Sequence, residues 1–107
     1  MLMVIFLALS VADPGPRRIA LANNPAVWVM PSDFRKGSVR PWGRRIVFSL
    51  KVDGSGIADG CEVLETSGSA AVDAVVCEAA QRRARFIPAL EELGQPRRSS
   101  FNQALRF

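Results

Sequence analysis

The sequence of 107 residues contains no histidine and no tyrosine, and it contains only two cysteines. Without histidine, no Ser-His or Cys-His pair can activate a nucleophile, and no tyrosine is present to act as an acid. The acidic residues are scattered along the chain, so no pair of carboxylates stands out for acid–base catalysis. We therefore expect that the protein is not an enzyme and that it needs no cofactor.

Metal and phosphate sites are also not indicated by the sequence. Cys61 and Cys77 are not spaced as a CxxC redox pair, and two cysteines without histidine make a poor zinc site. Gly54 and Gly56 lie in a predicted hairpin turn rather than before a helix, which argues against a phosphate-binding loop. The sequence thus predicts neither a bound metal nor a bound nucleotide.

The charged residues give the chain a net charge of +4, from 14 basic and 10 acidic residues. Much of the positive charge comes as arginine pairs, which are Arg17-Arg18, Arg44-Arg45, Arg82-Arg83 and Arg97-Arg98. These pairs are dispersed and form no continuous basic run, whereas nucleic-acid binding normally clusters such residues on one element. The pattern favours a solvated basic surface over a nucleic-acid interface.

The first twelve residues, MLMVIFLALSVA, are uncharged and almost entirely apolar. A bilayer span takes about 20 residues, so this segment is too short to be a membrane helix. Its length and the small-residue end at residues 10–12 fit a signal peptide, although a basic segment before it is missing. We expect export to the periplasm, with membrane anchoring only if the true N-terminus is longer; the alternative is a buried N-terminal strand or helix.

Residues 13–31 contain four prolines and no sustained hydrophobic period, which predicts an extended lead-in or linker. The folded domain is predicted over residues 32–107. It begins with a short helical turn, for which Ser32 is the candidate cap and Gly37 the candidate end.

A β-hairpin follows. Ile46, Phe48, Leu50 and Val52 alternate with other residues, as in a strand with one buried face. The sequence VDGSG then predicts a turn. In the returning strand, residues 57–65, the alternation places Ile57, Cys61 and Val63 on one side. Ala58, Glu62 and Leu64 fall on the other side.

A helix is predicted between Ser69, its candidate N-cap, and Pro88, which cannot lie inside a helix. A last alternating segment then places Phe101, Leu105 and Phe107 on one face, interrupted by Gln103. The fold class is therefore α+β, with a β-β-α-β core. One long helix packs on a three-stranded antiparallel sheet, preceded by a short N-terminal helix.

Cys61 and Cys77 lie 77 − 61 = 16 positions apart, one in the returning strand and one in the helix. A helix packed on its preceding strand can bring such positions within the Cα separation of about 4.4–6.8 Å that a disulfide requires. The remaining alternatives are a disulfide and two buried thiols. Because export would place them in an oxidising compartment, we expect the disulfide.

Four motifs, in this order, carry a resemblance to a known family: VDGSG, CEVLETSGSAAVD, RRARFIPAL, and LGQP before a final strand ending in Phe107. Together they resemble the C-terminal domain of TonB, the energy transducer of outer-membrane transport. The segment NNPAVWVMPSDF is similar to a Trp-x-x-x-x-Asp-aromatic pattern of small cysteine-containing relatives. The resemblance covers residues 28–107.

The resemblance implies a binding function in which a transporter segment adds as an extra strand beside the last strand of the domain. The implied partner-binding residues are Ser99, Ser100, Phe101, Asn102, Gln103, Ala104, Leu105 and Arg106. Alternatively, the lead-in or a second copy of the chain covers this edge. Arg97 and Arg98 are candidates either for meeting acidic partner groups or for keeping the edge soluble.

The sequence thus leaves several functions open. The first is a periplasmic TonB-like module that binds an outer-membrane transporter segment, or another envelope protein, in transport across the envelope. The second is a structural, self-associating envelope module, such as a homodimer, without a transport role. A basic secreted binder of anionic polymer or nucleic acid is the weakest of the three.

Overall fold

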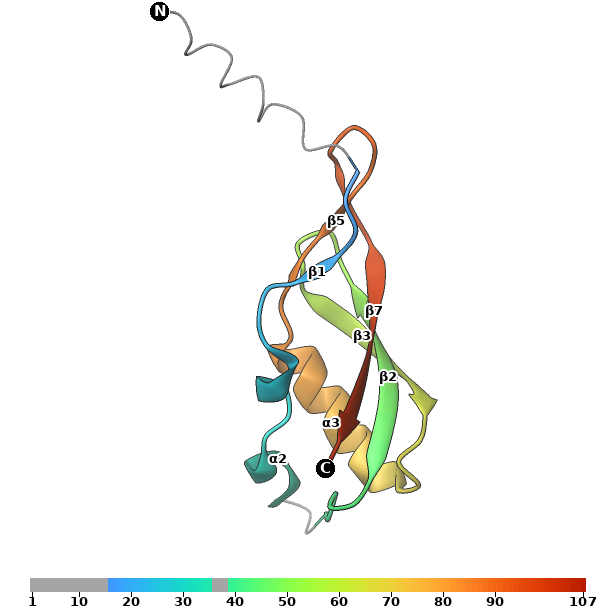
Figure 1. Cartoon of the computed structure of the whole chain (residues 1–107). Coiled ribbons are helices and arrows are strands. Elements are labelled where there is room, and N and C mark those ends of the chain that lie inside the picture. The colour runs from blue at the N-terminus through green and yellow to red at the C-terminus, as the bar shows by residue number, and fades with distance from the viewer. Residues whose placement is uncertain (1–15, 36–38) are drawn as a thin grey trace, which may run out of the picture.

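The computed structural model describes residues 16–35 and 39–107. Its centre is a three-stranded antiparallel sheet in the order β3-β2-β7 (Figure 1). The central strand is β2 (Arg45–Val52), which pairs with β3 (Ala58–Glu65) on one side and with β7 (Ser99–Arg106) on the other. The predicted α+β class and the antiparallel pairing are confirmed.

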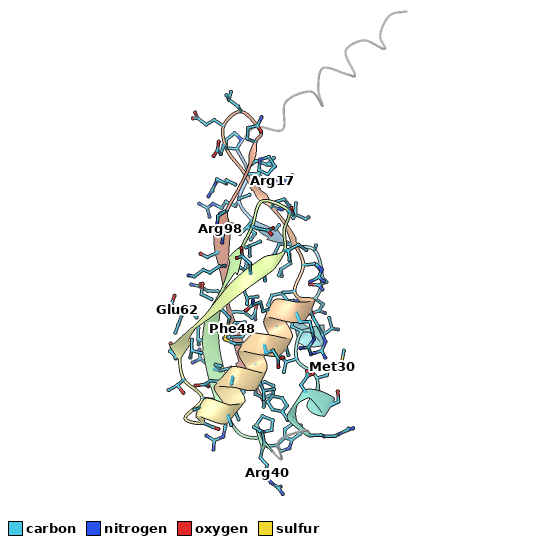
Figure 2. The ribbon with its side chains drawn as sticks, turned by 180° about the vertical axis from the view of Figure 1, so that it is seen from behind. Arg17, Met30, Arg40, Phe48, Glu62 and Arg98 are labelled. Atoms are coloured by element: carbon cyan, nitrogen blue, oxygen red, sulfur yellow. A yellow bond between two sulfur atoms is a disulfide. The ribbon has the colours of Figure 1, made fainter. Side chains whose placement is uncertain are left out.

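The sheet has one helical layer. The long helix α3 (Ala70–Arg83) lies behind β2 and β7 in Figure 1 and in front of the sheet in Figure 2. Alternate residues of β2 are fully buried beneath it, and Val72 and Val76 of α3 are fully buried as well. The core residues of these two elements are Ile46, Phe48, Leu50, Val52, Val72, Val76 and Ala80. The alternation of β2 thus faces the apolar stripe of α3, as the sequence predicts.

Two small ribbons extend this core. Strand β1 (Ala20–Leu21) pairs with β4 (Phe86–Ile87), and β5 (Ala89–Leu90) pairs with β6 (Pro96–Arg97). Arg17 also exchanges two backbone hydrogen bonds with Leu90, at 3.1 and 2.9 Å. The predicted description of a single sheet was therefore incomplete, because each of these pairings joins residues that carry no strand pattern of their own.

The residues expected as a lead-in contribute to the domain. They form β1 and a 3-10 turn, η1 (Pro25–Val27), and they are followed by the short helix α2 (Pro31–Arg35). Trp28, between η1 and α2, is completely buried. Ser32, the candidate cap, is instead the second residue of α2, which begins at Pro31. The candidate helix end at Gly37 and the expected signal peptide, residues 1–12, lie outside the described residues.

The expectation for the start of β3 was wrong. Ile57 was placed on the same side as Cys61 and Val63, but Ala58 is the buried residue, and Ile57 is 40% exposed. Lys51 pairs with Gly60 while Val52 pairs with Ala58, so one extra residue, Asp59, is inserted in β3. Such a bulge reverses the side on which the preceding residues lie.

The N-terminus of α3 follows the expectation from the sequence. Ser69 accepts a hydrogen bond from the amide of Val72 at 3.2 Å. The carboxylate of Asp73 accepts hydrogen bonds from the amide and the hydroxyl of Ser67, at 2.9 and 2.6 Å. These contacts satisfy donors of the turn before the helix, and they fix where α3 begins.

Cys61 and Cys77 form a disulfide between β3 and α3, with their Cα atoms 5.7 Å apart. The expected pairing is confirmed.

Among the helices of residues 16–35 and 39–107, none has the length and apolar character needed to cross a bilayer.

We expect the double substitution Cys61→Ala/Cys77→Ala to lower the free energy of unfolding by about 3 kcal/mol, because the disulfide closes a loop of this length. Denaturant unfolding in the absence of reductant measures the difference. A reducing agent should destabilise the wild type similarly and leave the variant unchanged. Thiol titration of the unfolded, unreduced wild type should find no free thiol; two free thiols would contradict the assignment.

A second prediction concerns the hairpin turn. Gly56 has φ +86°, and a Cβ atom placed on it would lie 2.1 Å from the carbonyl oxygen of Phe86. Gly56→Ala should therefore destabilise the domain by at least about 2 kcal/mol. At Gly54, the nearest atom to an added Cβ is in Pro96 at 3.5 Å, an ordinary contact. Gly54→Ala is the matched control and should cost less than about 1 kcal/mol; equal losses for both variants would contradict the prediction.

Candidate functional site

The two outer strands of the sheet differ in regularity. All eight residues of β7 pair with β2 in an uninterrupted register, from Val52↔Ser99 to Arg45↔Arg106. The register of β3 is broken twice, at Leu64 and at Asp59. Bulges twist an edge and hinder the addition of a strand. The regular edge of the sheet is therefore β7.

Within the described residues, no segment pairs with the outer edge of β7. The lead-in residues that form a strand pair with β4, not with β7. The sequence left two possible covers for this edge, the lead-in and a second copy of the chain. The described residues of the lead-in do not cover it. No strand formed by the described residues covers the outer edge of β7.

The register also determines which backbone groups point outward. The amide of Phe107 donates to the carbonyl oxygen of Arg44, at 2.8 Å, so Phe107 is directed toward the central strand. Backbone groups of an antiparallel strand alternate in direction, so Phe101, Gln103 and Leu105 are directed toward β2 as well. The amides and carbonyls that face the free edge belong to Ser100, Asn102, Ala104 and Arg106.

One of these outward carbonyls has a partner within the strand. The side-chain nitrogen Nε2 of Gln103 donates to the carbonyl oxygen of Ala104, at 2.9 Å. This contact agrees with the outward direction of the Ala104 carbonyl. Gln103, which interrupts the apolar row of β7, thus reaches the free edge with its amide group.

The two faces of β7 differ in character. Phe101 and Leu105 are half-buried on the helix side, and Ser100, Asn102, Ala104 and Arg106 are exposed on the open side. The predicted site residues Ser99–Arg106 therefore form one strand, but they fall into two sets. The second set supplies the outward backbone groups and the exposed side chains.

The helix side of β7 is packed against aromatic residues of the N-terminal segment. The ring centroid of Trp28 lies 6.3 Å from that of Phe101 and 5.6 Å from that of Phe86, both in edge-on arrangements. Phe34 of α2 makes a similar contact with Phe107, at 5.4 Å. These contacts hold both the middle and the end of β7 from the helix side.

The N-terminal segment is in turn held by Arg83, in the last turn of α3. Its guanidinium forms two hydrogen bonds with the carboxylate of Asp33, at 2.6 and 2.8 Å, and a third with the carbonyl oxygen of Trp28, at 2.8 Å. The side chain of Asp33 is only 9% exposed. The hydrogen bonds from Arg83 lower the pKa of Asp33 to about 2.

Asn23 completes this arrangement. Its side-chain oxygen accepts from the indole nitrogen of Trp28 at 2.8 Å, and its side-chain nitrogen donates to the carbonyl oxygen of Arg83 at 2.9 Å. Sequence reasoning did not identify Asn23 or the pairing of Asp33 with Arg83. The only signal was the resemblance to a Trp-x-x-x-x-Asp-aromatic pattern, which contains Trp28 and Asp33.

The basic residues before β7 are not equivalent. Arg98 forms two hydrogen bonds with the carboxylate of Asp59, both at 2.9 Å, so an acid of the chain itself already neutralises it. Arg97 is exposed, and its guanidinium donates to the backbone oxygen of Arg98 at 3.4 Å.

For metal binding, the described part of the chain offers no group of three or more acidic or cysteine side chains.

A family model described as the C-terminal domain of the Gram-negative bacterial TonB protein matches residues 43–107. This range contains the whole three-stranded sheet and α3, but not Trp28 or Asp33. No curated protein and no solved structure matches the chain.

The ion pair of Asp33 predicts a pH dependence. Because the pKa of Asp33 is about 2 in the fold and 3.8 for the ordinary carboxyl group, its stabilisation is complete above about pH 5. It is lost as the pH falls through about 2, and it amounts to about 2 kcal/mol. Unfolding by denaturant between pH 5 and pH 2 should show this loss in the wild type and a flatter profile in Asp33→Asn. Parallel profiles for the two proteins would contradict the role of Asp33.

Proposed function

This chain belongs to the family of Gram-negative bacterial TonB protein C-terminal domains, protein-interaction modules of the cell envelope, and we propose that it binds an extended segment of an envelope protein as an added strand beside β7. The proposed partner is a periplasmic segment of an outer-membrane transporter. The proposed location is the periplasm, after export, and the proposed role is in transport across the envelope. The function is one of binding, without catalysis or a cofactor.

The observation that carries the proposal is the free and regular edge of β7. Its outward amides and carbonyls, at Ser100, Asn102 and Ala104, have the spacing that an added strand requires. Main-chain hydrogen bonds to such an edge supply affinity with little dependence on the partner's side chains. The half-buried Phe101 and Leu105 provide apolar surface beside the added strand.

Self-association is the second candidate function, because two copies of β7 could pair with each other as a homodimer. Symmetric antiparallel pairing would place the Arg98 end of one strand beside the Arg106 end of the other. Arg98 is already paired with Asp59, so its charge adds little repulsion, but β7 contains no acidic residue that could neutralise Arg106 of the other copy. The charges of β7 therefore support a different partner rather than a second copy of the chain.

Substitution of Asn102 tests strand addition. Proline at this position removes an outward amide and leaves the hydrogen bonds between β7 and β2 in place, as proline on an edge strand does. We expect Asn102→Pro to weaken binding more than about tenfold, since several backbone contacts are disturbed at once. Asn102→Val, which keeps the amide, should bind within about twofold of the wild type.

The probes are synthetic peptides from the periplasm-facing ends of outer-membrane transporters, and calorimetry measures the binding. Circular dichroism checks that both variants are folded. Sedimentation at increasing concentration, without peptide, measures self-association. A concentration-dependent dimer that Asn102→Pro abolishes, together with no affinity for any peptide, would favour the self-associating module instead.

A further inference from the structure

The position of Arg106 is electrostatically unfavourable. It lies directly opposite Arg45 in the register of β7 and β2, on the open side of the sheet. Like charges in this position repel each other. Arg45 is neutralised by Glu65, at 2.9 Å, but among the described residues no carboxylate forms an ion pair with Arg106.

The other cations on this face have acidic partners, all of which come from β3. Lys51 pairs with Glu62 at 3.4 Å, and Arg98 pairs with Asp59 at 2.9 Å. Glu62 projects from β3 in Figure 2. Strand β7 itself contains no acidic residue. The open face is therefore acidic along β3, and Arg106 is the only charged residue of β7 and forms no ion pair with any of the described residues.

A strand added beside β7 would bring its side chains into two rows. One row would lie on the helix side, beside the half-buried Phe101 and Leu105. The other would lie on the open side, beside Ser100, Asn102 and Ala104, which are small or uncharged, and beside Arg106. A carboxylate in this second row can reach Arg106 without displacing any ion pair of the domain.

Resting on the proposed strand addition, we propose that the β7 edge selects a segment that alternates apolar and polar residues and carries a carboxylate on its polar row beside Arg106. Arg106 is then the residue that determines specificity for charge. The backbone of β7 supplies the contacts that do not depend on sequence. The apolar row fixes which side of the segment faces the helix.

Three labelled ten-residue peptides test this inference. In the first peptide, Val alternates with Thr. In the second peptide, the first and the last Thr are replaced by Glu, and in the third peptide the same two positions are replaced by Lys. In fluorescence anisotropy at low salt, the wild type should bind the Glu peptide most tightly, the Thr peptide less tightly and the Lys peptide most weakly. Each step should be about two- to fivefold in affinity, as for exposed ion pairs. The steps should shrink at high salt, because the charges are screened.

The variants locate the effect. Arg106→Ala should bind all three peptides nearly equally, and Arg106→Glu should invert the order. Arg98→Ala is the matched control, because Arg98 is already paired with Asp59, and it should keep the order of the wild type. Thermal unfolding checks that each variant is folded.

The possible failures are distinguishable. If the peptides bind the wild type without regard to charge, or if Arg106→Ala keeps the preference for Glu, the role of Arg106 is wrong, while strand addition stands. If none of the three peptides binds the wild type and transporter-derived peptides do not bind either, strand addition at β7 itself is wrong.

Discussion

One guanidinium group connects the end of α3 with the N-terminal segment, and the packing of β7 depends on it. Arg83 contacts both Asp33 and the backbone of Trp28, so it determines where the aromatic residues before the sheet are placed. Trp28 is thereby buried against Phe101. A cation in the last turn of a helix is also favoured by the helix dipole, so Arg83 is suited to this position before it has any partner.

The disulfide and the Arg83 contacts brace opposite sides of the domain. Cys61–Cys77 ties β3 to the middle of α3, and Arg83 ties the end of α3 to the segment that packs beneath β7. Strand β7 is held by β2 and by aromatic contacts on one face, and no segment of residues 16–35 or 39–107 pairs with its outer edge. A domain of this size has a small core, so two such braces contribute a large share of its stability.

The sequence predicts what depends on local pattern. The alternation of β2, the cap at Ser69, the disulfide and the extent of the last strand all follow from residues close together in the chain, aided by the family resemblance. The bulge at Asp59 could not be predicted, because it depends on the pairing of β3 with Lys51 and Val52. The ribbons β1-β4 and β5-β6 are only two residues per strand and leave no periodicity.

At the candidate site, the alternation of the sequence predicted the two faces of β7, with Phe101 and Leu105 together on one of them, but it could not predict which backbone groups face outward. Which amides face outward depends on the register between β7 and β2. The hydrogen bond between Phe107 and Arg44, residues far apart in the chain, reveals this register. The same holds for the arginines. Arg98 and Arg106 look alike in the sequence, and only the folded sheet brings Asp59 to the first and leaves the second opposite Arg45.

An open strand edge poses a physical problem that the charges of β7 address. Main-chain hydrogen bonding cannot tell a correct partner from a second copy of the chain, since every edge offers the same groups. Discrimination must therefore come from the side chains beside the edge, and it needs repulsion as well as attraction. Strand β7 contains Arg106 and no acidic residue, so a second copy offers this cation no carboxylate, and the side chain of Gln103 occupies one outward carbonyl. If strand addition occurs as proposed, the cation that a second copy leaves without a carboxylate is the one that attracts a carboxylate of the partner, so Arg106 would serve both protection of the edge and selection of its partner.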